Sequence, residues 1–80
     1  MSRRKKRQPD AELFGQIVRA HREARGWTQE ELAERAEMNA SYLGFVERGD
    51  NVPTLTIIIQ LAEGLEVSPA DLLRDLMKRR

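Results

Sequence analysis

The chain has 80 residues, a formal net charge of +1 and no cysteine. A chain of this length forms one small domain, near the lower limit for a self-sufficient core. The lack of cysteine excludes disulfides and thiolate metal sites. No apolar run approaches the roughly 18 residues of a membrane span, and the basic N-terminus lacks the apolar stretch of a signal peptide. A cytoplasmic protein is expected.

The basic residues are concentrated at the N-terminus. Arg3, Arg4, Lys5, Lys6 and Arg7 are five of the 14 basic residues, whereas residues 8–80 carry nine basic and 13 acidic groups. This pattern predicts a flexible basic arm over residues 1–9 and a folded domain over residues 10–80. Two interpretations of the arm remain open: a solubilising tail, or a segment that binds a polyanion.

The first expected helix starts at Asp10, a possible N-cap, and runs to about Arg25, where Gly26 ends it. The predicted inner residues of this helix are Leu13, Phe14, Ile17 and Val18, with His21 or Ala24 as a further inner position. His21 is interpreted as a helix-surface residue. No metal site is expected, because the chain has one histidine and no cysteine.

Two short helices joined by a tight turn are predicted over residues 28–49. Thr28 and Glu31 have the spacing of a capping box, so a helix should begin at Thr28. Asn39 can cap the second helix, and Gly49 should end it. Ala33 is small at the point where the two helices must cross closely. This arrangement indicates a helix-turn-helix.

Two further helices are predicted after Gly49. Thr54 caps one over Leu55–Leu65, whose inner residues should be Leu55, Ile58, Leu61, Ala62 and Leu65. Ser68 caps the other, with Pro69 at its favoured first position. The apolar residues exceed what so small a bundle can bury, which favours a homodimer over scattered exposed leucines. The predicted dimer interface consists of Ile57, Ile59, Leu72, Leu73, Leu76 and Met77.

The pattern RxxxGxTQxxLAxxAxMxxxYLxxxERG, from Arg22 to Gly49, resembles the Cro/repressor-type (xenobiotic-response-element) helix-turn-helix of bacterial and phage regulators. The resemblance covers roughly residues 11–76. Because several spaced elements agree at once, it is a strong signal. It implies an all-α fold, a compact five-helix bundle of the lambda-repressor-like DNA-binding type.

The resemblance also implies roles for individual residues. In such proteins the second helix of the motif lies in the major groove of DNA. Arg22 and Glu47 match a partly buried structural ion pair, and Trp27 matches a core position. The positions matching base-reading residues are Asn39, Ala40, Ser41, Gly44 and Phe45. The positions matching contacts to the DNA backbone are Thr28, Gln29, Tyr42, Arg48, Asn51 and Thr54.

Two residues depart from the family pattern. Glu37 occupies a turn position that usually holds glycine, because the residue there tends to need a positive φ. Gly44 lies inside the recognition helix, where glycine costs up to about 1 kcal/mol relative to alanine. Its lack of a side chain is compatible with a close approach of DNA.

The resemblance implies a transcriptional regulator that binds double-stranded DNA sequence-specifically. It would act as a dimer on an inverted-repeat operator in the nucleoid, as a repressor or autoregulator. Small phage repressors and restriction–modification controller proteins are similar. The alternative is an antitoxin-type module that neutralises a toxin and regulates its own operon. RNA polymerase and a cognate toxin are possible further partners. No cofactor is implied, and an enzyme is not expected, since the sequence offers no nucleophile–base pair, metal-ligand cluster or phosphate loop.

Overall fold

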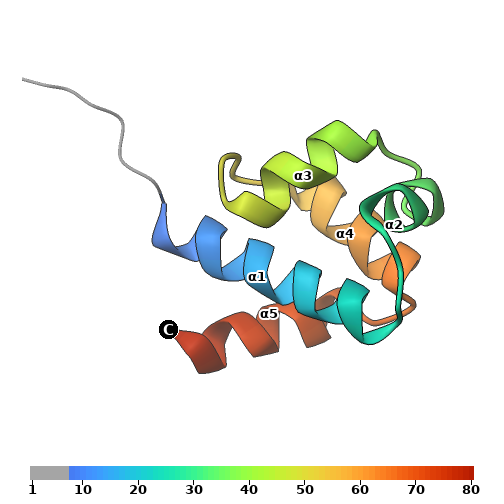
Figure 1. The fold of residues 1–80 in the computed structure, drawn as a ribbon. Helices are drawn as coiled ribbons and strands as arrows, with labels where there is room; N and C mark the ends of the chain where they lie inside the picture. The colour runs from blue at the N-terminus through green and yellow to red at the C-terminus, as the bar shows by residue number, and fades with distance from the viewer. Residues whose placement is uncertain (1–7) are drawn as a thin grey trace, which may run out of the picture.

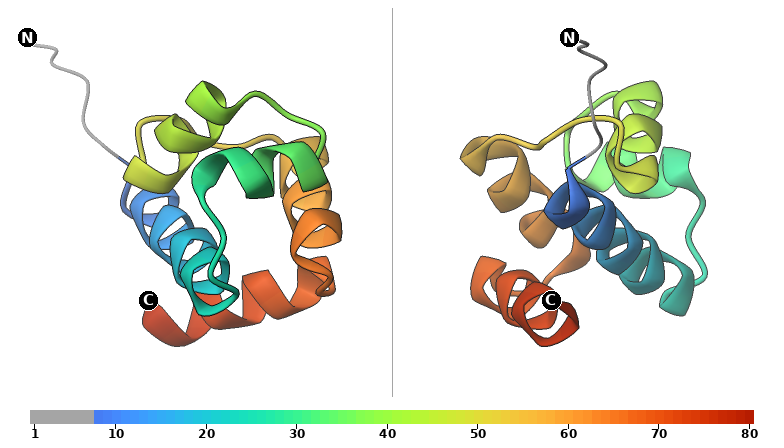
Figure 2. Two further views of the ribbon diagram at one scale, coloured as in Figure 1. Left: turned by 45° about the vertical axis from the view of Figure 1, so that its right-hand side comes forward. Right: turned by 90° about the vertical axis from the view of Figure 1, so that its left-hand side faces the viewer.

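The computed structural model describes residues 8–80, which form five α-helices and no β-strand (Figure 1). In chain order they are α1 (Pro9–Ala24), α2 (Gln29–Arg35), α3 (Ala40–Arg48), α4 (Leu55–Leu65) and α5 (Pro69–Arg79). Helix α1 lies between α3 on one side and α5 on the other, and α2 packs on both α3 and α4 (Figure 2). The all-α, five-helix expectation is confirmed.

The predicted caps account for the starts of four helices. The Thr28 hydroxyl oxygen accepts from the Glu31 backbone N–H at 3.1 Å, and the Glu31 carboxylate accepts from the Thr28 N–H at 2.8 Å, which is the predicted capping box. Asn39, Thr54 and Ser68 also accept backbone N–H groups of the helices that they begin. Local chemistry therefore places each of these helix starts.

The predicted start of α1 at Asp10 is wrong. The helix begins at Pro9, and Gln8 is its N-cap without a side-chain hydrogen bond. Proline is favoured at the first helical position, because its fixed φ suits the helix and its missing N–H would have no partner there. The Asp10 carboxylate instead forms an ion pair with Arg80 at 3.2 Å. Pro9 therefore belongs to the folded domain, and the rest of the proposed arm up to Arg7 lies outside the described residues.

One apolar core joins all five helices. Its centre is formed by side chains with at most 1% exposure: Ile17, Val18, Leu32, Leu43, Val46, Leu61, Ala62, Leu65 and Leu72. Gly15 allows α1 to approach α3 closely, since a Cβ atom there would lie 2.3 Å from the Val46 carbonyl oxygen. The core thus fixes α3 against α1 through a backbone contact that leaves no room for a side chain.

Two apolar residues lie differently from the prediction. Leu55, expected inside, is 70% exposed. It shares an exposed edge of α4 with Ile59, one turn along, while Leu61 and Leu65 define the buried stripe. Leu72, expected at a dimer interface, is fully buried in the core. Its neighbour on α5, Leu73, is 40% exposed.

His21 and Trp27 connect elements rather than lying free on the surface or deep in the core. His21 is partly exposed, and its Nε2 lies 3.1 Å from the Asp75 carboxylate, which links α1 to α5. Trp27 is half-buried and packs against the core. The Arg35 guanidinium lies 4.0 Å from the centroid of its ring, a cation–π contact.

Candidate DNA-binding site

The turn between α2 and α3 sets the angle of the proposed recognition helix. Glu37 has φ +58°, as expected for the position that usually holds glycine. The Met38 N–H donates to the Ala33 carbonyl at 2.9 Å. Gln60 of α4 donates through Nε2 to the carbonyls of Ala36 and Glu37, at 3.0 and 3.2 Å. The turn is therefore held from α4, a contact that the sequence did not reveal.

Helix α3 runs along one edge of the molecule, on the side away from α5 (Figure 2). Of the predicted base-reading residues, Asn39, Ser41 and Phe45 are exposed and Ala40 is half-buried. Ser41 and Phe45 are one turn apart on the same face. The Asn39 side-chain oxygen accepts from the N–H groups of Ser41 and Tyr42, at 2.7 and 3.2 Å. Because the oxygen is engaged in this cap, the side-chain nitrogen of Asn39 is the atom that can donate a hydrogen bond to a base edge.

Gly44 does not lie open to solvent, in contrast to the interpretation that it admits DNA. It is buried, although it lies on the same side of α3 as Ala40 and Ser41. A Cβ atom at Gly44 would lie 3.2 Å from Arg48 Nη1 and 3.7 Å from Gln29 Oε1. Side chains from two helices thus cover this glycine.

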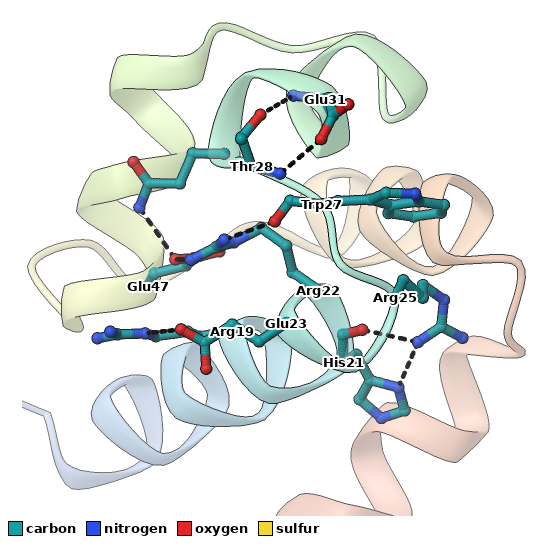
Figure 3. A network of polar contacts seen from close by, with 10 residues as sticks. Arg19, His21, Arg22, Glu23, Arg25, Trp27, Thr28, Glu31 and Glu47 are labelled. Carbon is teal, nitrogen blue, oxygen red and sulfur yellow. Dashed lines mark hydrogen bonds and ion pairs between the residues drawn. The ribbon is translucent and has the colours of Figure 1, made fainter.

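A polar network joins α1 to the two helices of the motif (Figure 3). Arg22 donates to both carboxylate oxygens of Glu47, at 2.7 and 2.9 Å, and to the Trp27 carbonyl at 2.8 Å. Gln29 Nε2 donates to the same Glu47 carboxylate at 3.0 Å. The hydrogen bond from Glu47 raises the pKa of Arg22 above its usual value. The ion pair implied by the resemblance is present, and it also orients Gln29.

The other residues expected at the DNA backbone flank α3. Thr28, Arg48 and Thr54 are exposed, while Tyr42 and Asn51 are half-buried. Arg48 Nε donates to the Asp50 carboxylate at 3.0 Å, and its guanidinium lies 5.1 Å from the Phe45 ring centroid. The Thr54 hydroxyl oxygen caps α4 by accepting the Ile57 N–H at 3.2 Å.

An apolar surface lies over α4, α5 and the loop before α4. It includes two residues that the sequence prediction missed, Val52 and Leu55, at 65% and 70% exposure. Of the predicted interface, Ile59, Leu73 and Met77 are exposed, and Ile57 and Leu76 are half-buried. A small cavity of about 130 Å³ opens beside Val52, Leu73 and Leu76, and its other lining residues are Asp10, Ala11, Phe14, Pro53 and Ile58.

The part of the chain covered by the structure contains no cluster of three or more potential metal ligands. Within residues 8–80, no helix is long and apolar enough to cross a membrane.

The capped α2–turn–α3 unit, held against α1 by a buried ion pair, defines a helix-turn-helix protein of the lambda-repressor-like fold. The chain belongs to the helix-turn-helix family, whose sequence profile matches residues 18–72. This is a family of DNA-binding transcriptional regulators.

Two relatives place the chain within this family. The HTH-type transcriptional regulator YazB of Bacillus subtilis (strain 168) is 38% identical over 63 residues, which are 79% of this chain and 91% of the relative. Control protein C.SmaI of Serratia marcescens is 37% identical over 62 residues, 78% of this chain and 74% of the relative.

Among solved structures, the restriction–modification controller protein C.AhdI from Aeromonas hydrophila is similar, with a TM-score of 0.79 and 40% sequence identity. The match covers 81% of this chain and 98% of the controller protein. The resemblance to controller proteins seen in the sequence is thus confirmed in the fold.

Proposed function

We propose that this protein is a sequence-specific regulator that binds an inverted-repeat DNA operator as a homodimer and represses or autoregulates transcription. The observation that carries the proposal is the placement of α3. Its N-terminal residues Ser41 and Asn39 and its Phe45 ring are exposed on one edge, while Leu43, Val46 and Glu47 anchor the opposite side in the fold. An α-helix presented in this way fits the major groove.

The chemistry of the exposed edge supports a division between base reading and backbone contact. The Ser41 hydroxyl and the Asn39 amide can hydrogen-bond base edges, and Ala40 and Phe45 can contact a thymine methyl group. Gln29 and Arg48 flank this set and carry the N–H donors that suit phosphate oxygens. The similarity to restriction–modification controller proteins supports the same role in regulation.

Replacing Ser41 with alanine should weaken operator binding more than binding to random DNA, because a base-edge hydrogen bond is lost. The expected loss of operator affinity is about tenfold. Arg48→Ala should weaken binding to both DNAs alike and lower the salt slope by about one. Fluorescence anisotropy titrations on both duplexes at several salt concentrations measure these effects. Equal losses for Ser41→Ala on the two DNAs would show that another face of α3 reads the sequence.

Homodimer formation is supported by the apolar surface over α4 and α5. Leu73 and Met77 are one turn apart on α5 and are 40% and 61% exposed, and Leu55 and Ile59 have the same spacing on α4. Large exposed apolar residues gathered beside a small cavity are typical of an interaction surface. In the proposed dimer, two recognition helices lie about 34 Å apart, one turn of DNA.

The double variant Leu73→Glu/Met77→Glu should be monomeric at tens of micromolar, where the wild-type protein sediments as a dimer, because burying the new carboxylates without partners is unfavourable. Sedimentation velocity measures the difference. The control Gln16→Glu/Ala20→Glu places two glutamates at exposed positions of α1 and should remain dimeric. A wild-type monomer, or a double variant that still dimerises, would refute the proposed interface.

A further inference from the structure

We propose that Gly44 is a positioning residue: the absence of a side chain there seats the Arg48 guanidinium beside the Gln29 amide, so that the two side chains bind the same stretch of DNA backbone. This inference rests on the proposed DNA-binding function and deepens it. It gives a role to the glycine inside α3, where an alanine would make a more stable helix.

The geometry around Gly44 brings the two side chains to one place. Arg48 Nη1 lies 3.2 Å from the position of a Cβ atom on Gly44, and the oxygen and nitrogen of the Gln29 amide lie 3.7 and 3.9 Å from it. Gln29 comes from α2 and Arg48 from the last turn of α3. A side chain at position 44 would therefore contact both of them.

Other contacts hold each side chain in this arrangement. Arg48 is held by the Asp50 carboxylate, 3.0 Å from Nε, and by the Phe45 ring, 5.1 Å from the guanidinium carbon. Gln29 is held by the Glu47 carboxylate, 3.0 Å from its Nε2. A primary amide has two N–H donors, and the contact with Glu47 uses one of those of Gln29. Binding DNA then requires little further ordering of either side chain.

The charge around the motif makes the position of Arg48 important. Residues 28–50 contain two basic residues, Arg35 and Arg48, and six acidic ones. Arg35 stacks on Trp27, with its guanidinium 4.0 Å from the ring centroid. Arg48 is therefore the basic residue that α3 itself brings to a polyanion, and a displacement of its guanidinium affects binding to any DNA sequence.

Substitutions at Gly44 should change stability and DNA binding in opposite directions. Gly44→Ala moves the flexible tip of Arg48 by a few tenths of an ångström, and Gly44→Leu fills the space that both side chains occupy. Both variants should melt at or above the wild-type temperature, since each replaces a helix glycine with a better helix former. Affinity for a mixed-sequence duplex should fall about threefold for Gly44→Ala and about tenfold for Gly44→Leu.

The decisive experiment repeats both substitutions in an Arg48→Ala background, by anisotropy titration on the mixed-sequence duplex across a range of salt concentrations. If Gly44 acts through Arg48, Gly44→Ala changes affinity there by no more than about twofold, because that interaction is already absent. Gly44→Leu should lose clearly less affinity there than in the wild-type background, since only its effect on Gln29 remains. In the wild-type background, Gly44→Leu should also lower the salt slope by up to about 0.9, toward that of Arg48→Ala.

The possible failures are distinguishable. Equal losses for Gly44→Leu in both backgrounds would mean that the added side chain meets the DNA directly, which overturns the positioning role and leaves DNA binding intact. Unchanged affinity and salt slope for Gly44→Leu in the wild-type background would also overturn it. A wild-type protein that binds no duplex even at low salt overturns the proposed function and this inference together.

Discussion

Glu47→Ala should lower the free energy of unfolding by about 3 kcal/mol or more, because it leaves the Arg22 guanidinium buried without its carboxylate. The Arg22 and Glu47 side chains are 11% and 3% exposed, and two hydrogen bonds of 2.7 and 2.9 Å join them. The same change removes the acceptor of Gln29. Urea-induced unfolding followed by circular dichroism measures the loss.

An exposed ion pair of similar length provides a matched control. Arg19 and Glu23 of α1 lie 2.9 Å apart with side chains 62% and 54% exposed. Glu23→Ala should cost no more than about 0.5 kcal/mol, since water and salt screen such a pair. Equal small losses for Glu47→Ala and Glu23→Ala would contradict the structural importance of the buried pair.

The secondary structure could be predicted from the sequence wherever a local chemical signal specifies a boundary. Thr28, Asn39, Thr54 and Ser68 each carry a side-chain oxygen that can accept backbone N–H groups, and each begins a helix. At the start of α1 two signals compete, Asp10 as a cap and Pro9 as a first residue. The proline determines the boundary because its backbone is already restricted.

Contacts between helices could not be predicted from the same signals. Nothing near Gly15 in the sequence indicates that it faces the backbone of α3, because the partner carbonyl belongs to Val46, far along the chain. Gln60 reads as a polar residue of α4, yet it holds the turn before α3. Leu72 and Leu73 were both predicted at the dimer interface, but the packing of α5 buries Leu72 in the core and leaves Leu73 40% exposed.

In the candidate DNA-binding site, too, some features could be predicted from the sequence and others could not. The buried ion pair and the exposure of Ser41 and Phe45 follow from the resemblance and from helix periodicity. The coverage of Gly44 depends on where the long side chains of Gln29 and Arg48 fold, which a sequence pattern does not specify. The orientation of flexible side chains is set by their partners, here Glu47 and Asp50.

Removing the basic arm should reduce affinity for any DNA duplex more than any single substitution in α3. Residues 8–80 carry nine basic and 13 acidic groups and are therefore net negative. The five positive charges at positions 3–7 are the highest concentration of positive charge in the chain, and they offset this negative charge. These residues lie outside the described part of the structure, and their contact with DNA is a proposal. Each phosphate contact that they provide adds about 0.9 to the salt slope.

The deletion should end at Arg7, because the Gln8 carbonyl accepts the Glu12 N–H at 3.1 Å in the first turn of α1. The fold should then survive, with an unchanged melting temperature. A second variant with glutamine at positions 3–7 keeps the length and removes only the charge, so the two variants should lose affinity equally if phosphates are the partner. If the arm enters a minor groove, operators with A·T-rich flanks should lose most. Salt titrations that give the same slope with and without the arm would identify it as a solubilising tail, and the affinity would then have to come from Gln29 and Arg48.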